Sequence, residues 1–407
     1  IAVLCPWVIP QRTCAHYKYF YMLIFDTLTI TVCGVLLLIA VATPFCNVLF
    51  RRPDLDSESS VSNGKSGENM QMPGFSIIIP VHNNAMEIER NLPDLLEQEY
   101  SGKYEVIVVD ESSNDETEDV LKRLKSQYAN LYTTFIPDTS HYLSRRKLSI
   151  TIGVKAAKYP WLVIMSADCH PSSNNWLATM ASHCDNNSEL ILGETRYDDN
   201  ATDYERLDNI KSWFRQLKKA QNSTAYAYCG RNLAVRRDIF MKHNGFLKNL
   251  KFLRGEYDFL VNEYATPYNT SVATESDALV IREAPTKKGW INEKLFFIMT
   301  SRHLERSMAY HLPVIIDTIL LHATFVALIA AIAVSAVFGL YIITAAAGVS
   351  LVFNYLIKTW IASKAMKAID EDIAAWKIPF LEMSEIWRKT FLNIKFIRSN
   401  KEDFIRR

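Results

Sequence analysis

The segment from Phe75 to Thr117 constrains the fold of this chain more than any other part of the sequence. It contains two short apolar runs, Phe75-Ser-Ile-Ile-Ile-Pro-Val81 and Tyr104-Glu-Val-Ile-Val-Val-Asp110, and each run leads into a polar turn. The stretch between them has helical spacing, with an apolar face formed by Ile88, Leu92, Leu95 and Leu96. A strand, a helix and a parallel strand form half of a nucleotide-binding α/β sheet, whose ligands lie beyond the carboxyl ends of the strands.

A third apolar run begins at Tyr159 and leads into Ser166, Ala167 and Asp168. It therefore ends near an acid, as the second run does at Asp110. Three strands that run in one direction bring their polar ends to one edge of a sheet, and two of these ends are acidic. Such an edge predicts a site for a phosphorylated ligand that is bound with a metal ion.

Composition argues against two other kinds of site. The chain has 407 residues, a formal net charge of +1 and no stripe of basic and aromatic residues, so no nucleic-acid partner is expected. Its seven cysteines include no Cys-x-x-Cys pair, which argues against a structural zinc site. The cysteines of the central part are expected to be reduced thiols, whereas a disulfide between Cys5 and Cys14 stays open.

Three apolar runs are long enough to cross a membrane. The first is Leu28–Thr43, and the others are approximately Pro313–Val337 and Phe338–Ile357. The last two are separated only by a short region around Gly339, which predicts a helical hairpin. A cleaved signal peptide is the alternative for the first run, but no basic segment starts the chain and no small-x-small site precedes the linker.

Basic residues flank each run on one side. They are Arg51 and Arg52 after the first run, Lys294, Arg302 and Arg306 before the second, and Lys358, Lys364 and Lys367 after the third. Because basic flanks stay in the cytoplasm, the N-terminus is predicted outside and the central part of the chain inside.

Several motifs, taken in order, resemble those of membrane-anchored family 2 glycosyltransferases with a GT-A fold. The resemblance covers about Phe75 to Leu304 and includes the two polar turns and the Ser166-Ala167-Asp168 step. Its other segments are Ser144–Leu148 with Gly153–Ala157, Gly230–Ala234, Gly255–Asp258 with Val261-Asn262, and Trp290–His303. The implied fold class is α/β: a GT-A domain with a mostly parallel central sheet and flanking helices, plus one N-terminal and two C-terminal transmembrane helices, as in bacterial members.

The resemblance and the composition together divide the chain into five parts. The linker is rich in Ser, Asn, Gly, Asp and Glu, and the tail mixes apolar residues with Lys and Arg. The predicted parts are an N-terminal segment with the first transmembrane helix (1–50), a flexible linker (51–72), the GT-A domain (73–304), a transmembrane hairpin (305–360) and a cytoplasmic amphipathic tail in the membrane interface (361–407).

The resemblance implies a site for a nucleotide-diphospho-sugar donor. Asp168 stands where the family places its metal-binding acid, so it is predicted to hold Mg²⁺ or Mn²⁺; a helix N-cap is the alternative. Ser166 departs from the family, which usually has Asp there, and loses one negative charge. Arg145 and Lys147 are predicted to pair with the diphosphate, and a solvated helix face is the alternative. The predicted donor-binding residues are Pro80, His82, Asn83, Asp110, Arg145, Lys147, Ser166, Ala167 and Asp168.

The acceptor motif Gly255-Glu-Tyr-Asp258 also departs from the family pattern. Tyr257 stands at the position of the family's general base, and its unperturbed pKa of about 10 makes it a poor base at neutral pH. We therefore predict Asp258 as the catalytic base, with Glu256 second. Arg302-His303 resembles the end of the Gln-x-x-Arg-Trp motif of processive synthases, but the Gln and Trp are replaced, which favours single additions. The predicted acceptor-binding residues are Asn232, Tyr257, Arg302 and His303.

The resemblance implies an inverting, metal-dependent glycosyltransferase at the cytoplasmic face of a bacterial inner membrane. The expected donor is a UDP- or GDP-sugar, the expected acceptor is a lipid-linked saccharide or polyprenyl phosphate, and the expected setting is cell-surface polysaccharide synthesis. The alternative is a catalytically degenerate GT-A domain that acts as a nucleotide-sugar-binding or partner-binding scaffold. Ser166 and Tyr257 motivate this alternative, because both replace acids of the family pattern.

Overall fold

The computed structural model describes three stretches of the chain, residues 26–53, 72–137 and 144–404. The chain divides into two compact units, one of residues 1–51 and 312–386 and the other of residues 52–311 and 387–407. Most of the predicted linker, and both Cys5 and Cys14, lie outside the described residues.

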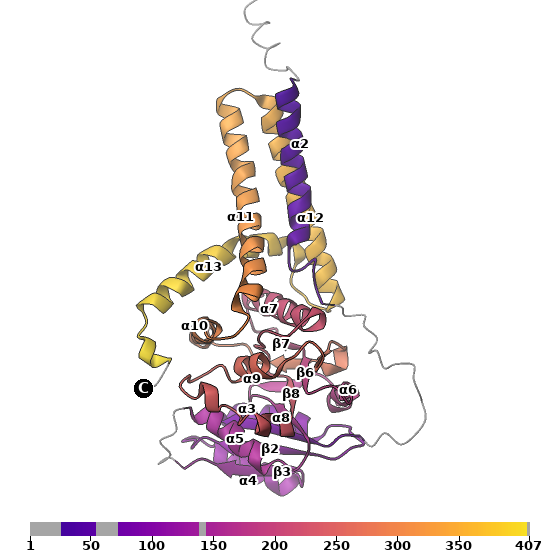
Figure 1. The fold of residues 1–407 in the computed structure, drawn as a ribbon, viewed down its shortest axis with the longest axis vertical. Helices are drawn as coiled ribbons and strands as arrows, with labels where there is room; N and C mark the ends of the chain where they lie inside the picture. Colours follow the sequence, from indigo (N-terminus) through magenta and orange to yellow (C-terminus); the bar gives the residue numbers. More distant parts are fainter. Residues whose placement is uncertain (1–25, 54–71, 138–143, 405–407) are drawn as a thin grey trace, which may run out of the picture. The chain divides into compact units, whose positions relative to one another are not determined.

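The larger unit is built on a seven-stranded sheet with the order β3-β2-β1-β4-β8-β6-β9. Its strands are β1 (Phe75–Val81), β2 (Tyr104–Asp110), β3 (Leu131–Phe135), β4 (Trp161–Ile164), β6 (Leu190–Gly193), β8 (Leu233–Arg236) and β9 (Thr270–Ala273). Of these strands, β2, β3, β6 and β8 are labelled in Figure 1. β8 is antiparallel to β4 and β6, whereas the other neighbours in the sheet are parallel. The predicted mostly parallel α/β sheet is therefore confirmed.

β1 occupies the position that brings the polar strand ends together. It runs parallel to both neighbours, with Phe75 paired with Tyr104 of β2 on one side and with Trp161 of β4 on the other. Every residue of β1 is buried, as expected for a Val- and Ile-rich strand that is covered on both faces. The carboxyl ends of β2, β1 and β4 consequently lie next to one another at one edge of the sheet.

A second, three-stranded sheet was not predicted. It has the order β5-β10-β7, with β5 (Cys169–Pro171), β7 (Thr195–Tyr197) and β10 (Val280–Arg282). β10 lies in the middle, so that Arg282 is paired with Cys169 on one side and with Tyr197 on the other. This pairing places Arg282 beside Asp168, more than a hundred positions earlier in the chain.

Eight α-helices surround the two sheets in the described part of this unit. They are α3 (Ala85–Leu96), α4 (Thr117–Gln127), α5 (Arg145–Ala156), α6 (Trp176–Ser182), α7 (Asp203–Asn222), α8 (Arg237–Lys242), α9 (Glu256–Tyr264) and α10 (Lys287–Ser301). α3 buries the predicted face, including Ile88, Leu92 and Leu95. α5 packs closely on β1, because a Cβ atom at Gly153 would lie 2.5 Å from Cγ2 of Ile78.

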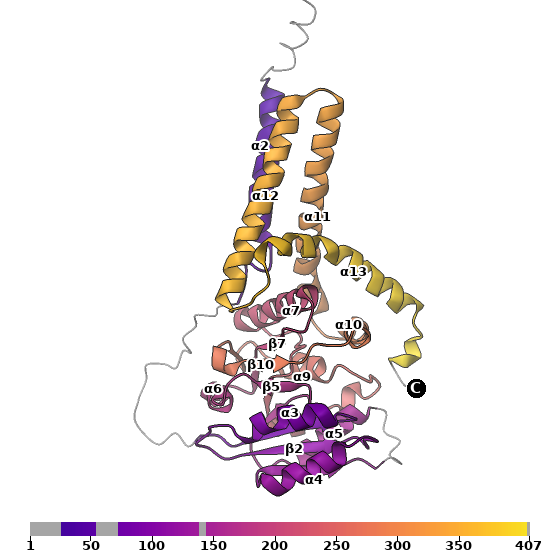
Figure 2. The same cartoon turned by 180° about the vertical axis from the view of Figure 1, so that it is seen from behind.

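The smaller unit contains three helices that are long and apolar enough to cross a membrane. They are α2 (Thr27–Ala42), α11 (Ser307–Val337) and α12 (Tyr341–Ala368), and both Figure 1 and Figure 2 show them side by side. Many of their large apolar side chains are exposed, as a lipid-facing surface requires. Asn354 of α12 donates to the carbonyl oxygen of Ala40 in α2 at 2.7 Å, which joins the first helix to the hairpin.

The hairpin and the tail agree in part with the prediction. Gly339, with a φ of 70°, forms the predicted turn between α11 and α12, but α12 continues eleven residues beyond the predicted Ile357. The tail contains α13 (Ile378–Arg398), which begins in the smaller unit and ends in the larger one. Near its end Phe396 is buried and packs against Phe404. The interfacial position of the tail stays a prediction.

Candidate active site

The loops that follow β1 and β2 are locked together by hydrogen bonds. The backbone N–H of Asn83 donates to Oγ of Ser113 at 2.9 Å, and Oδ1 of Asn83 accepts from the backbone N–H of Asn114 at 2.7 Å. Oδ1 of Asp110 accepts from the backbone N–H and the hydroxyl of Ser113. The structure therefore brings the predicted donor-binding residues Asn83 and Asp110 together, with His82 exposed beside them.

Arg146, in the first turn of α5, connects three parts of the site. Its Nη1 atom donates to the carbonyl oxygen of Pro80 at 3.2 Å, and its Nη2 atom donates to Oγ of Ser166 at 3.0 Å. Its Nε atom forms an ion pair with Glu256 at 3.3 Å. Arg146 thus joins the ends of β1 and β4 to the acceptor motif. Sequence reasoning singled out the basic segment but chose its neighbours Arg145 and Lys147.

The two neighbours have different environments. Arg145 donates through Nη2 to the carbonyl oxygen of Glu111 at 2.8 Å and to Oγ of Ser112 at 2.9 Å, next to the end of β2. Lys147 is fully buried, and its ammonium donates to the carbonyl oxygens of Asn249 and Phe252 at 2.7 and 2.8 Å. Burial lowers the pKa of Lys147 to about 8. These contacts give Lys147 a structural role in the interior, so the structure does not place its ammonium at the edge of the sheet.

Asp168 lies between β4 and β5, and its side chain is 28% exposed. Its carbonyl oxygen accepts from the backbone N–H of Glu283, and its Oδ2 atom accepts from Nε of Arg282 at 2.8 Å. Burial raises the pKa of Asp168, but the charges of Arg282 and Arg231 outweigh this effect, and the pKa lies well below its usual value. A strand follows this residue, so the alternative of a helix N-cap is wrong.

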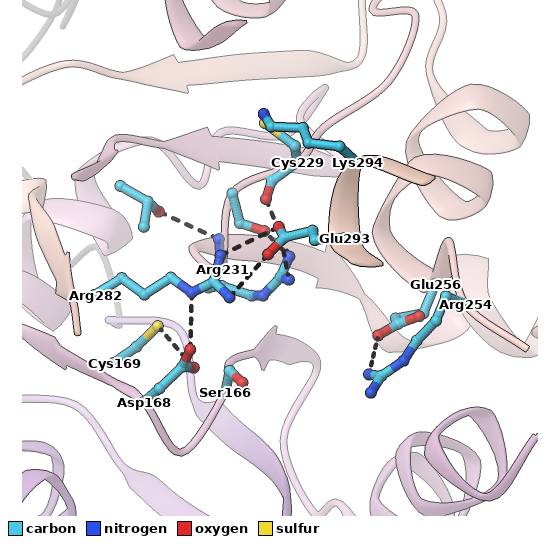
Figure 3. A network of polar contacts seen from close by, with 12 residues as sticks. Ser166, Asp168, Cys169, Cys229, Arg231, Arg254, Glu256, Arg282, Glu293 and Lys294 are labelled. Atoms are coloured by element: carbon cyan, nitrogen blue, oxygen red, sulfur yellow. Dashed lines mark hydrogen bonds and ion pairs between the residues drawn. The ribbon is translucent and has the colours of Figure 1, made fainter. Parts of the chain in front are cut away.

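Arg282, Arg231 and Glu293 form a charged network with Asp168 (Figure 3). The Nη1 and Nη2 atoms of Arg282 lie 3.1 and 3.0 Å from the two carboxylate oxygens of Glu293, and Nη2 of Arg231 lies 3.2 Å from Oε1. Burial raises the pKa of Glu293, but Arg282 and Arg231 lower it to about 2. Sequence reasoning missed this network. Arg231 lies within the Gly230–Ala234 motif and Glu293 of α10 within the Trp290–His303 segment, but neither was singled out, and no motif included Arg282.

The acceptor motif forms the start of α9. Gly255 has a φ of 91°, which a residue with a side chain rarely adopts, and it turns the chain into the helix. Glu256 is buried and forms ion pairs with Arg146 at 3.3 Å and with Arg254 at 3.8 Å. Burial raises the pKa of Glu256, but Arg254 and Arg146 outweigh it, and the pKa is lowered. Glu256 is thus an ionised partner of two arginines.

Tyr257 and Asp258 are buried in the same turn, with 3% and 8% of their surface exposed. The guanidinium of Arg231 lies 4.9 Å from the centre of the Tyr257 ring, and the phenol has no hydrogen-bond partner within the described chain. Burial raises the pKa of Tyr257 further, so this phenol does not act as a base near neutral pH. Burial and Glu256 raise the pKa of Asp258 to about 7. Its predicted role as the base stays a prediction.

Four predicted site residues form contacts with other residues of the larger unit. Asn232 is fully buried, and its amide donates to two backbone carbonyls, those of Glu194 and Ala278. Ala167 is buried, and its carbonyl oxygen accepts from the side chain of Asn91 at 2.9 Å. The other two have aromatic neighbours in the same unit: Arg302 has its guanidinium 4.7 Å from the Phe396 ring centre, and His303 has its ring 4.8 Å from that of Phe252. These four residues are therefore engaged in packing contacts within the unit, and their predicted binding roles stay predictions.

The donor atoms available here fit one kind of metal site. Asp168 offers one partly exposed carboxylate, and Ser166 offers a hydroxyl two residues earlier. Among residues 26–53, 72–137 and 144–404, no group of three or more His, Cys, Asp or Glu side chains could hold a metal ion. Because Mg²⁺ is commonly held by one or two carboxylates and completed by substrate phosphates, these residues fit a cation that is bound together with a diphosphate.

Comparisons with known proteins give a family and two relatives. Residues 76–243 match the family Glycosyl transferase family 2. The glycosyltransferase AglE of Haloferax volcanii is 28% identical over 172 residues, which cover 41% of this chain and 54% of that protein. The chondroitin synthase of Escherichia coli is 30% identical over 99 residues, which cover 24% of this chain and 14% of that protein. This chain thus matches about half the length of the first relative and a small part of the second.

A solved structure also resembles the chain. It is the mannosyltransferase PcManGT from Pyrobaculum calidifontis in complex with GDP-Man and Mn²⁺, which is 17% identical. The superposition covers 89% of this chain and 99% of that chain, with a TM-score of 0.49.

Proposed function

We propose a reaction for this chain, which carries a glycosyl transferase family 2 domain at residues 76–243 and the mixed α/β sheet typical of the GT-A fold. The reaction is transfer of a sugar, with inversion, from a nucleotide-diphospho-sugar to a lipid-linked saccharide or polyprenyl phosphate. The donor nucleotide is UDP or GDP. The observation that carries this proposal is the contact of Arg146 with Pro80, Ser166 and Glu256, which joins the donor edge to the acceptor motif.

The strand ends would hold the donor. Asp110, Asn83 and His82 lie at the ends of β1 and β2, where the nucleoside of the donor would bind. Arg145 and Arg146 lie next to them and favour a nearby anion. Asp168 would hold Mg²⁺ or Mn²⁺ together with the phosphates of the donor. Such a cation, when bound, neutralises charge that develops on the departing diphosphate.

Asp258 would accept the proton of an acceptor hydroxyl. In an inverting transfer the acceptor oxygen forms a bond to the anomeric carbon while the bond to the diphosphate oxygen breaks on the opposite face. The proton of the hydroxyl passes to a base, and the bonding electrons leave with the nucleoside diphosphate. With a pKa of about 7, Asp258 is partly ionised at neutral pH and still basic enough to take this proton. A phosphate acceptor carries its own negative charge and needs no such base.

The membrane helices support the rest of the proposal. Three helices are long and apolar enough to span a bilayer, and the basic residues that flank them favour a cytoplasmic position for residues 73–304. This topology is consistent with a bacterial inner membrane and with an acceptor that is itself anchored in lipid. It is also consistent with a role in cell-surface polysaccharide synthesis. The tail would lie in the membrane interface, since Trp387 and Ile397 of α13 are more than 70% exposed.

Donor turnover tests the proposal directly. The full chain is assayed in detergent for release of nucleoside diphosphate from UDP- and GDP-sugars, with added lipid extract and with Mg²⁺ or Mn²⁺. We expect turnover that depends on the metal and falls at least about a hundredfold in Asp168→Ala, the scale of losing one charge-stabilising group. Turnover that is unaffected by both chelation and Asp168→Ala would contradict the proposed chemistry.

One observation favours a second candidate, a scaffold that binds nucleotide-sugar or a partner without turnover. Tyr257 places a buried phenol where the family has its base, and Ser166 removes a charge near Asp168. Calorimetry separates the two candidates: donor binding without turnover, unrestored by Tyr257→Asp, favours the scaffold. Turnover in the wild-type chain excludes it.

A further inference from the structure

We propose that Arg282 and Arg231 bind the diphosphate of the donor, and that Arg282 forms an ion pair with Asp168 until the donor binds. A divalent cation then binds to Asp168 only together with the donor. This inference rests on the proposed function, because it assigns residues to the same diphosphate.

The first step is the position of Arg282. Its backbone is fixed at the middle of the small sheet, between Cys169 of β5 and Tyr197 of β7. From there its Nε atom reaches Oδ2 of Asp168 at 2.8 Å, while its two terminal nitrogens face Glu293. The guanidinium of Arg282 therefore binds the carboxylate of Asp168 that the metal would need. It approaches this carboxylate from the side of the small sheet.

The second step is the local charge. Two guanidiniums, those of Arg282 and Arg231, share the carboxylate of Glu293, and Nε of Arg282 lies 2.8 Å from Oδ2 of Asp168. A dication at Asp168 would therefore lie close to two positive charges, and Coulomb repulsion would oppose its binding. Within the described residues no second and third acidic side chain join Asp168 to offset this repulsion. A cation alone consequently binds weakly at this site.

The third step is the effect of a diphosphate. It carries at least two negative charges, and the planar guanidinium of arginine matches phosphate oxygens in pairs. Arg282 and Arg231 are partly exposed, with 14% and 15% of their side chains accessible, and both form ion pairs with Glu293. A diphosphate that binds these two arginines draws Arg282 away from Asp168. It also supplies the phosphate oxygens that complete the coordination of the cation.

A Mn²⁺ titration of the full chain in detergent tests this inference, read from the EPR signal of free Mn²⁺ with and without UDP or GDP. We expect the wild type to take up Mn²⁺ tightly only with the nucleotide. Arg282→Gln should bind Mn²⁺ without nucleotide at least about tenfold more tightly than the wild type, because one positive charge beside Asp168 is gone. Asp168→Asn should bind no Mn²⁺ in either condition. Arg236→Gln, which breaks a surface pair with Asp238, is the matched control and should behave as the wild type.

Nucleotide affinity gives a second measurement without metal. Calorimetry should show that Arg231→Gln and Arg282→Gln each weaken UDP or GDP binding about tenfold, the effect of losing a charged hydrogen bond. Thermal unfolding checks that both variants fold. If Arg282→Gln does not fold, the nucleotide affinity of Arg231→Gln and the Mn²⁺ titration of the wild type still test the inference.

Two results separate the inference from the proposed function. Equal Mn²⁺ affinity of the wild type with and without nucleotide, in a chain that turns over donor, overturns the inference alone. Absence of Mn²⁺ uptake even at saturating UDP and GDP overturns the metal part of the proposed function, and the inference with it.

Discussion

Asp258 and Glu256 lie two positions apart at the start of α9, yet their environments differ. Glu256 faces Arg146 and Arg254, and these charges hold its pKa below the usual value although burial opposes them. Oδ1 of Asp258 has no hydrogen-bond partner in the described chain, and burial raises its pKa to about 7. Of the two, only Asp258 changes its charge near neutral pH, which is the property that a general base requires.

The pH dependence of turnover tests this assignment. If Asp258 takes the proton of an acceptor hydroxyl, its ionised form is active, so the rate should rise with pH up to about 7 and then level off. Asp258→Asn should lower the rate about a hundred- to a thousandfold and remove the rise. Asp238→Asn, at an exposed acid, is the control. A rise that persists in Asp258→Asn would exclude this residue as the base.

The stability of the fold should fall as the pH rises, whereas the rate of turnover should rise. The pKa of Asp258 is about 7 in the fold and about 4 in the unfolded chain, so the folded state binds an extra proton between these values. Its contribution to stability is therefore complete below about pH 4 and is lost as the pH rises through about 7. The full loss is of the order of 4 kcal/mol for a shift of about three units. Thermal unfolding at pH 5 and pH 8 should differ less for Asp258→Asn than for the wild type; equal differences would contradict the raised pKa.

The basic run after Ser144 shows where residue-level prediction from the sequence reaches its limit. The basic run after Ser144 was expected to meet the diphosphate, and α5 does begin there. Successive residues on a helix point about 100° apart, so Arg145, Arg146 and Lys147 cannot all face one site. Only the packing of α5 on β1 decides that Arg146 faces the acceptor motif and that Lys147 enters the core. The order of these residues in the sequence does not show which of them faces the site.

At the scale of elements, the sequence predicts contacts between elements that are close in the chain better than contacts between distant ones. β1, α3 and β2 are neighbours in sequence, and their apolar periodicity predicted them together with the edge where their polar ends meet. The small sheet joins Cys169, Tyr197 and Arg282 through strands of three residues each, too short to show a period. The network of Arg282 and Glu293 depends on that sheet, and so it could not be predicted.

The contact between α5 and β1 gives a prediction at this scale. Gly153→Ala places a Cβ atom 2.5 Å from Cγ2 of Ile78, so α5 must shift and carry Arg146 with it. We expect a loss of about 1–3 kcal/mol in stability, typical of overpacking, together with weaker nucleotide binding. Gly348→Ala is the matched control, since nothing lies within 4 Å of its added Cβ atom in α12. Unchanged thermal unfolding and nucleotide affinity in Gly153→Ala would show that this close contact does not position the arginine.

At the scale of the whole molecule, the length and charge of the apolar runs predicted three membrane helices, and the described structure has three helices that are long and apolar enough to cross a membrane, α2, α11 and α12. Their ends were less predictable, because α12 continues to Ala368 through residues that are mixed in polarity. Hydropathy detects the lipid-facing part of such a helix but not its extension beyond the bilayer. Orientation across the membrane remains a prediction from the basic flanks alone.

Cysteine labelling of intact cells tests that orientation. In a variant whose seven cysteines are replaced by serine or alanine, Leu340→Cys is introduced in the turn after α11, and Lys248→Cys in the larger unit. Both positions are exposed, with Leu340 at 47% and the side chain of Lys248 at 72%. If residues 73–304 lie in the cytoplasm, as the basic flanks predict, an impermeant maleimide should label Leu340→Cys in intact cells and Lys248→Cys only after permeabilisation. The reverse pattern would place the candidate site on the other side of the membrane, away from cytoplasmic nucleotide-sugars, and would contradict the proposed donor.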